Sequence, residues 1–97
     1  MEIDTESMGR HGYRVVGRVQ GVGFRWWTRR TAEKLGLYGS VRNLPDGAVE
    51  VQVAGGINEL AEFEESLRYG PVGARVDILE SIESAAECPS DAFRIDS

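Results

Sequence analysis

The 97-residue sequence has few of the residues that build disulfides and metal sites, with one cysteine and one histidine. A single cysteine, Cys88, excludes a disulfide within the chain and suits a reducing compartment. We expect no catalytic role for Cys88, which stands before Pro89 in a predicted loop. His11, without a second histidine or clustered cysteines, offers too few ligands for zinc or iron, so we expect no metal and no cofactor.

Long apolar runs and an excess of positive charge are also lacking. No apolar run approaches the roughly 20 residues of a membrane-spanning helix, and the opening MEIDTESMGRH has no apolar segment of the kind found in signal peptides. The net charge of -5 and an isoelectric point near 4.8 disfavour binding to nucleic acids or anionic membranes. We therefore expect a cytoplasmic monomer without either partner, with a disordered tail over residues 1–11 and one domain over residues 12–97.

Hydropathy patterns along this domain predict five strands and two helices. The predicted strands cover residues 13–16, 39–43, 49–53, 75–83 and 93–95. Apolar residues at three- and four-residue spacing predict one helix from Phe24 to Leu35 and a second between Asn58 and Gly70. The order is βαββαβ with a short extra C-terminal strand. It predicts an α+β protein, a ferredoxin-like α/β sandwich whose mostly antiparallel sheet is covered on one face by two helices.

The stretch GRVQGVGFR, residues 17–25, combines three glycines with the predicted start of a helix. Glycine lets the backbone bend without a Cβ clash, so N–H groups of this loop and of the helix N-terminus can surround an anion. Arg25 lies in the first helical turn, where its guanidinium can bind the same anion. A tight turn with a surface arginine explains these residues equally well. The Gly-Lys-Ser/Thr ending of a Walker A loop is absent, so we expect no Mg²⁺-nucleotide site.

Asn43 stands just before a predicted turn, LPDGA at residues 44–48, and its carboxamide can both donate and accept hydrogen bonds. Taken alone, it is typical of an ordinary turn residue. Together, however, GRVQGVGFR and the later stretch VRNLPDGAVE, residues 41–50, resemble the paired motifs of the acylphosphatase family. The segment YGPVGARVD, residues 69–77, continues the resemblance, which covers about residues 12 to 96.

The acylphosphatase family has the same ferredoxin-like sandwich, and the resemblance also implies a reaction. That reaction is hydrolysis of the carboxyl-phosphate bond of a small acyl phosphate to a carboxylate and inorganic phosphate, without a metal ion. The resemblance assigns phosphate binding to Arg25 and positioning of the attacking water to Asn43. The remaining residues of the implied phosphate cradle are Gly17, Arg18, Val19, Gln20, Gly21, Val22 and Gly23.

Three positions depart from the family pattern without removing an implied functional group. Ser40 stands where an aromatic residue is common, Leu44 where some members carry a hydroxyl, and Gly23 where certain members have cysteine. No feature of the sequence identifies the acyl group, and carbamoyl, acetyl and glycolytic acyl phosphates all stay open.

Two other functions fit parts of the pattern. The first is a catalytically silent module with a phosphate-sensing or regulatory role. It would keep the glycine loop and Arg25 but would not need an asparagine at the position of Asn43. A nucleic-acid-binding domain of this fold would stack bases on strand aromatics, yet the first predicted strand offers only Tyr13 and the third offers none.

Two adjacent tryptophans, Trp26 and Trp27, lie in the first predicted helix. Neighbouring side chains point about 100° apart on a helix, so we expect Trp27 in the core and Trp26 partly covered.

Overall fold

The computed structural model describes residues 8–85 and 91–96, which contain five strands and two helices. The strands are β1 (Met8–Arg18), β2 (Tyr38–Asn43), β3 (Val49–Gly56), β4 (Arg75–Ile82) and β5 (Phe93–Ile95). The helices are α1 (Phe24–Lys34) and α2 (Ile57–Tyr69). No helix within the described ranges is long and apolar enough to cross a membrane.

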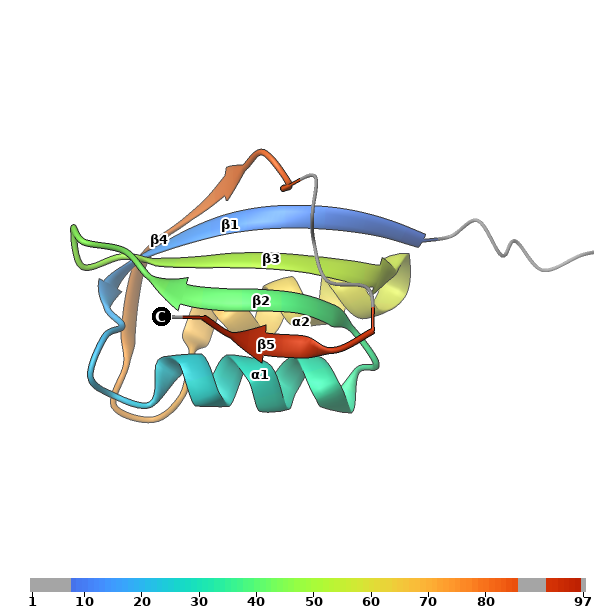
Figure 1. Cartoon of the computed structure of the whole chain (residues 1–97). Coiled ribbons are helices and arrows are strands. Elements are labelled where there is room, and N and C mark those ends of the chain that lie inside the picture. The colour runs from blue at the N-terminus through green and yellow to red at the C-terminus, as the bar shows by residue number, and fades with distance from the viewer. Residues whose placement is uncertain (1–7, 86–90, 97) are drawn as a thin grey trace, which may run out of the picture.

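The five strands form one sheet in the order β4-β1-β3-β2-β5 (Figure 1). β1 pairs antiparallel with both β3 and β4, and β2 pairs antiparallel with β3. The short β5 runs parallel to its neighbour β2. Both helices lie on the same side of the sheet in Figure 1. This arrangement is the ferredoxin-like sandwich that the order of elements predicts.

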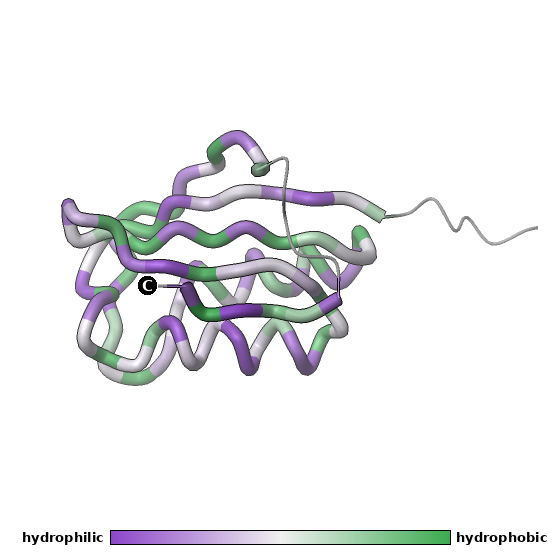
Figure 2. The backbone as a smooth tube through the Cα atoms, in the orientation of Figure 1, coloured by the Kyte–Doolittle hydropathy of each residue, from purple (hydrophilic) through white to green (hydrophobic). Residues whose placement is uncertain are grey.

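The hydrophobic core lies between the sheet and the two helices. Val49, Val51 and Val53 of β3 are fully buried, and Figure 2 shows apolar and polar positions alternating along this strand. Phe24 of α1 and Phe63 of α2 belong to the same buried cluster. Burial of one such side chain contributes about 1.5–3 kcal/mol, so the helix that carries Phe24 is firmly held against the sheet.

β1 begins at Met8, whereas the sequence predicts a disordered tail over residues 1–11. That prediction is wrong for residues 8–11, whose backbones pair antiparallel with the end of β3. This stretch has no alternation of apolar and polar residues that would predict a strand. Its extended backbone is instead held by the pairing with β3. The rest of the predicted tail, residues 1–7, lies outside the described residues, as does Cys88.

β3 continues to Gly56, beyond its predicted end at Val53. Gly55 has a φ of +152°, and a Cβ at this position would overlap the side chain of Leu37. Glycine here permits a close approach between β3 and the segment before β2. Gly55 and Gly56 therefore belong to β3, which does not end at Val53 as predicted.

Candidate active site

Residues 19–23 connect β1 to α1 and make up the glycine loop. Gly21 and Gly23 have φ angles of +78° and +77°, and nothing lies within 4 Å of a Cβ built at either position. Glycine is therefore needed here for the left-handed backbone rather than for space. Gly23 is the N-cap of α1, and its carbonyl accepts a hydrogen bond from the N–H of Trp27 at 3.0 Å. No side chain of the described ranges caps this helix end, and its first turn has no acidic residue. The N-terminal N–H groups and the positive end of the helix dipole are thus left for another acceptor.

A pocket of about 190 Å³ adjoins the glycine loop. Residues from the loop, α1, β2 and β5 line it. They are Val19, Gly21, Gly23, Phe24, Arg25, Trp26, Asn43 and Ile95. Among the residues that the structure describes, Arg25 is the only charged one in this lining. The pocket therefore combines a helix N-terminus with one cation, which suits an anion.

Arg25 lies in the first turn of α1 and is half-buried. One of its guanidinium nitrogens, Nη1, donates to the backbone oxygen of Asp96 at 3.3 Å, directly after β5. Within the described part of the chain, no carboxylate forms an ion pair with Arg25. Carboxylates do contact Arg14, Arg29, Arg42, Arg68 and Arg75. The charge of Arg25 is therefore held in place by a neutral carbonyl and is available to an anion in the pocket.

Asn43 is the last residue of β2, and it lines the same pocket as the first turn of α1. Its side-chain oxygen Oδ1 is buried and has no hydrogen-bond partner among the residues that the structure describes. A buried polar atom left unpaired costs about 1–3 kcal/mol, so such an atom calls for an explanation, and a role in binding or catalysis is one of them. An acceptor of this kind beside a cation suits the binding of a water or a hydroxyl group.

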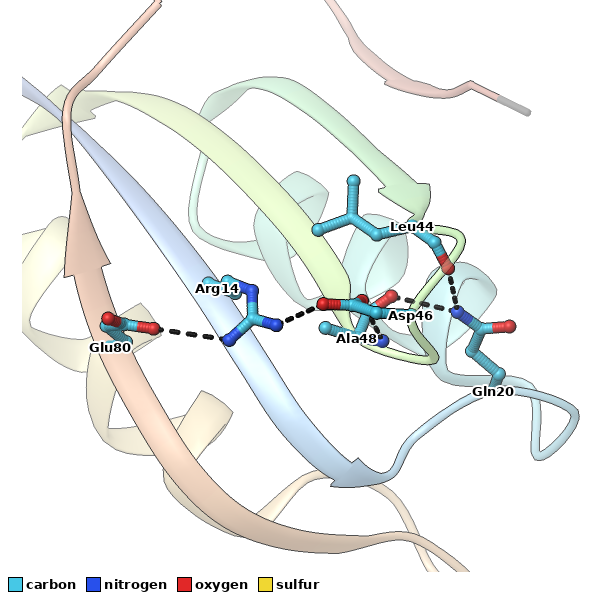
Figure 3. A network of polar contacts seen from close by, with 6 residues as sticks. All are labelled: Arg14, Gln20, Leu44, Asp46, Ala48 and Glu80. Atoms are coloured by element: carbon cyan, nitrogen blue, oxygen red, sulfur yellow. Dashed lines mark hydrogen bonds and ion pairs between the residues drawn. The ribbon is translucent and has the colours of Figure 1, made fainter.

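Gln20 joins the glycine loop to the turn between β2 and β3. Its side-chain amide donates to the backbone oxygens of Leu44 and Ala48, both at 2.9 Å. Figure 3 shows the side chain reaching from the loop to this turn. Since Leu44 directly follows Asn43, these two bonds fix the backbone on which the asparagine stands.

A second set of contacts reaches the same turn from the sheet. Asp46 accepts a hydrogen bond from the N–H of Ala48 at 3.0 Å and forms an ion pair with Arg14 of β1. Arg14 also reaches Glu80 of β4 at 3.4 Å (Figure 3). The N–H of Ala48 and the guanidinium of Arg14 lower the pKa of Asp46, which keeps this carboxylate charged. Exposed ion pairs stabilise little, so Gln20 is the stronger of the two braces.

The acylphosphatase family model matches residues 11–95. The chain belongs to the acylphosphatase family. An acylphosphatase of Nitratidesulfovibrio vulgaris (strain DP4) is 51% identical over 90 residues, which span 91% of this chain and 90% of that relative. The crystal structure of acylphosphatase from Bacillus subtilis matches with a TM-score of 0.84 at 34% identity, over 93% of this chain and 99% of that one. The structure of an acylphosphatase from Coxiella burnetii gives 0.83 at 33% identity, over 99% and 100%.

The predicted acylphosphatase family and the ferredoxin-like fold are therefore both confirmed. The structure brings several of the residues assigned by resemblance to one pocket. These are Val19, Gly21, Gly23, Arg25 and Asn43. The four other assigned residues, Gly17, Arg18, Gln20 and Val22, do not line the pocket.

In this acylphosphatase, each of these four residues lies outside the pocket lining. Gly17 lies within β1 at a bulge in the pairing with β4, where a Cβ would overlap the backbone oxygen of Arg75. Arg18 is the exposed last residue of β1, and Val22 packs partly buried against the core. The side chain of Gln20 bonds to the neighbouring turn.

Sequence reasoning did not place Trp26 or Ile95 in the acylphosphatase pocket, nor did it find the contact to Asp96. A three-residue strand carries no information about where it will pair, so only the sheet order brings β5 beside α1. In the described parts of the chain, no group of three or more histidine, cysteine, aspartate or glutamate residues is placed to hold a metal ion.

Proposed function

We propose that this acylphosphatase hydrolyses the carboxyl-phosphate bond of small acyl phosphates to a carboxylate and inorganic phosphate. It does so without a metal ion or cofactor, as a cytoplasmic monomer with no nucleic-acid or membrane partner. One observation supports this most strongly. Arg25, the N-terminus of α1 and the side chain of Asn43, whose Oδ1 has no partner within the described residues, all adjoin one small pocket.

Arg25 and the backbone N–H groups of the glycine loop hold the phosphoryl group. A guanidinium presents parallel N–H donors to two phosphoryl oxygens, and the N-terminus of α1 adds its positive dipole end. These groups are in place before the substrate binds, so they stabilise the charge that spreads over the phosphoryl oxygens in the transition state. Loss of one preorganised donor of this type lowers kcat by about 10²–10³.

Asn43 positions the attacking water through a hydrogen bond to its Oδ1. The water oxygen forms a bond to phosphorus while the bond from phosphorus to the acyl oxygen breaks, and the electron pair leaves with the carboxylate. Because a carboxylate is a good leaving group, no general acid is required. A carboxamide is too weak a base to remove the water proton, so that proton passes to a phosphoryl oxygen of the substrate.

The proposal is tested with benzoyl phosphate at neutral pH in the presence of EDTA, comparing the wild type with Arg25→Gln and Asn43→Ala. We expect turnover by the wild type and a loss of at least about 10²-fold in kcat in each variant. Inhibition by inorganic phosphate should persist in Asn43→Ala and weaken strongly in Arg25→Gln, because of these two side chains only that of Arg25 contacts the phosphoryl group. Arg29→Gln is the matched control, since Arg29 lies on the same helix and pairs with Glu33.

Other outcomes would contradict the proposed function or one part of its mechanism. Phosphate binding without any turnover by the wild type would favour a silent, phosphate-sensing module. Binding to nucleic acid that weakens steeply with salt would favour the nucleic-acid-binding alternative. Turnover that survives Asn43→Ala would leave the activity in place and contradict the assigned role of the asparagine. Turnover abolished by EDTA would contradict a metal-independent reaction.

A further inference from the structure

Two exposed apolar side chains line the pocket. Trp26 of α1 and Ile95 of β5 line it together with Arg25 and Asn43, and they are 57% and 36% exposed. A single exposed apolar side chain on a protein surface needs no explanation. Here two such side chains, which come from different elements, line the same pocket as the charged and polar groups. Apolar walls with a few convergent polar groups are the usual composition of a small-molecule site.

Trp26 is held in place without being covered. The guanidinium of Arg30 lies 4.9 Å from the centre of its ring, a cation–π contact that restrains the indole. The bond from Arg25 to the backbone of Asp96 fixes the chain directly after Ile95. Trp27, which was predicted to lie in the core, packs against the core and is only partly buried, so Trp26 is the tryptophan left to the pocket.

The lining also lacks a partner for a second charge. Arg25 is the only charged residue in it within the described part of the chain, and the phosphoryl group occupies this arginine when substrate is bound. A carboxylate or an ammonium group on the acyl side would leave water without gaining an ion pair in the pocket, which is unfavourable. An aromatic or aliphatic acyl group would instead exchange water for apolar contact.

We infer that Trp26 and Ile95 form the acyl-binding side of the site and that the enzyme prefers acyl phosphates with aromatic or apolar acyl groups. The inference rests on the proposed function. The acyl carbon is joined to the phosphoryl group through a single oxygen, so an acyl group must lie within a few bonds of Arg25. These two exposed side chains are the apolar surface of the pocket available to it.

The test compares kcat/KM for benzoyl phosphate and for acetyl phosphate in the wild type and in Trp26→Ala. The two compounds differ in intrinsic reactivity, but that difference is the same for every variant, so the change in their ratio reports on the side chain alone. We expect the benzoyl-to-acetyl ratio to fall about tenfold in Trp26→Ala, the lower end of the range for one methylene in an enclosed pocket. Trp26→Phe should keep most of the ratio, and inhibition by inorganic phosphate should stay unchanged in both variants.

Tyr69→Ala is the matched control, because Tyr69 is an aromatic residue that is 71% exposed at the end of α2 and does not line the pocket. The benzoyl-to-acetyl ratio of kcat/KM in Tyr69→Ala should equal that of the wild type. An unchanged ratio in Trp26→Ala, or an equal fall in Tyr69→Ala, overturns the acyl-binding side and leaves the hydrolase activity standing. Failure of the wild type to hydrolyse either compound overturns the proposed function itself, so the two failures are distinguishable.

Discussion

Gln20→Met removes the brace between the glycine loop and the turn that follows Asn43, while keeping a side chain of similar length. The variant loses two hydrogen bonds of 2.9 Å, to the backbone oxygens of Leu44 and Ala48. Each such bond contributes about 0.5–1.5 kcal/mol. Both oxygens keep a partner within the turn, since Leu44 accepts from Gly47 and Ala48 accepts from Leu44. We therefore expect a loss of about 1–2 kcal/mol in the free energy of unfolding and a fall in Tm of roughly 4–16 °C.

The same change should lower activity through Asn43 rather than through phosphate binding. A looser turn spreads the positions of the asparagine, and a loss of about 1.4 kcal/mol in transition-state stabilisation is a tenfold fall in kcat. Inhibition by inorganic phosphate should change by less than about twofold, because Arg25 is untouched. Gln52→Met is the matched control. The side chain of Gln52 of β3 also loses hydrogen bonds, which it donates to Glu50 and Glu83 and accepts from Ala85, but it lies outside the pocket, so stability should fall without a change in kcat.

A double-mutant cycle decides whether Gln20 acts through Asn43. Urea unfolding gives the stability of each variant, and residual kcat is measured with benzoyl phosphate at high enzyme concentration. In an Asn43→Ala background, Gln20→Met should have almost no further effect on kcat, because there is no longer an asparagine to position. A tenfold effect that persists in this background, or a stability loss without any loss of kcat in the single variant, would refute the reasoning.

Two further predictions concern stability. The N–H of Ala48 and the guanidinium of Arg14 hold the pKa of Asp46 below its ordinary value of 3.8, so its contribution is fully present above that value and disappears as the pH falls below about 4. The stability advantage of the wild type over Asp46→Asn, measured by urea unfolding, should shrink between pH 7 and pH 3; a constant difference contradicts this. Gly39→Ala should destabilise by about 3 kcal/mol or more, because φ is +146° and a Cβ would overlap the backbone oxygen of Gln52. An unchanged urea midpoint would contradict that expectation.

The parts of the fold that could be predicted are those with a local pattern. VEVQV alternates because one face of β3 is buried, and the pattern that sends Val51 inward is present in the sequence itself. The start of β1 at Met8 has no such pattern. Its extended backbone depends on pairing with Gly55 and Gly56, which are remote in the chain. Local hydropathy cannot report a pairing of this kind, and so the first strand was predicted too short.

The candidate site divides in the same way. Gly21, Gly23 and Arg25 share one short motif, and Asn43 stands in a second, so resemblance identified all four. The brace from Gln20 and the contact from Arg25 to the end of β5 are between side chains and backbone atoms. Backbone acceptors place almost no demand on residue type, and therefore leave no trace in the sequence.

The parallel pairing of β5 with β2 has a consequence for how the enzyme comes into existence during synthesis. Chains leave the ribosome from the N-terminus, so the glycine loop and Asn43 emerge long before β5. Yet Ile95 lines the pocket, and the bond from Arg25 to Asp96 joins positions 71 residues apart. Contacts of such long range form late in folding. A chain in which β5 has not yet docked therefore has both motifs but lacks one wall of the pocket and the contact that holds Arg25.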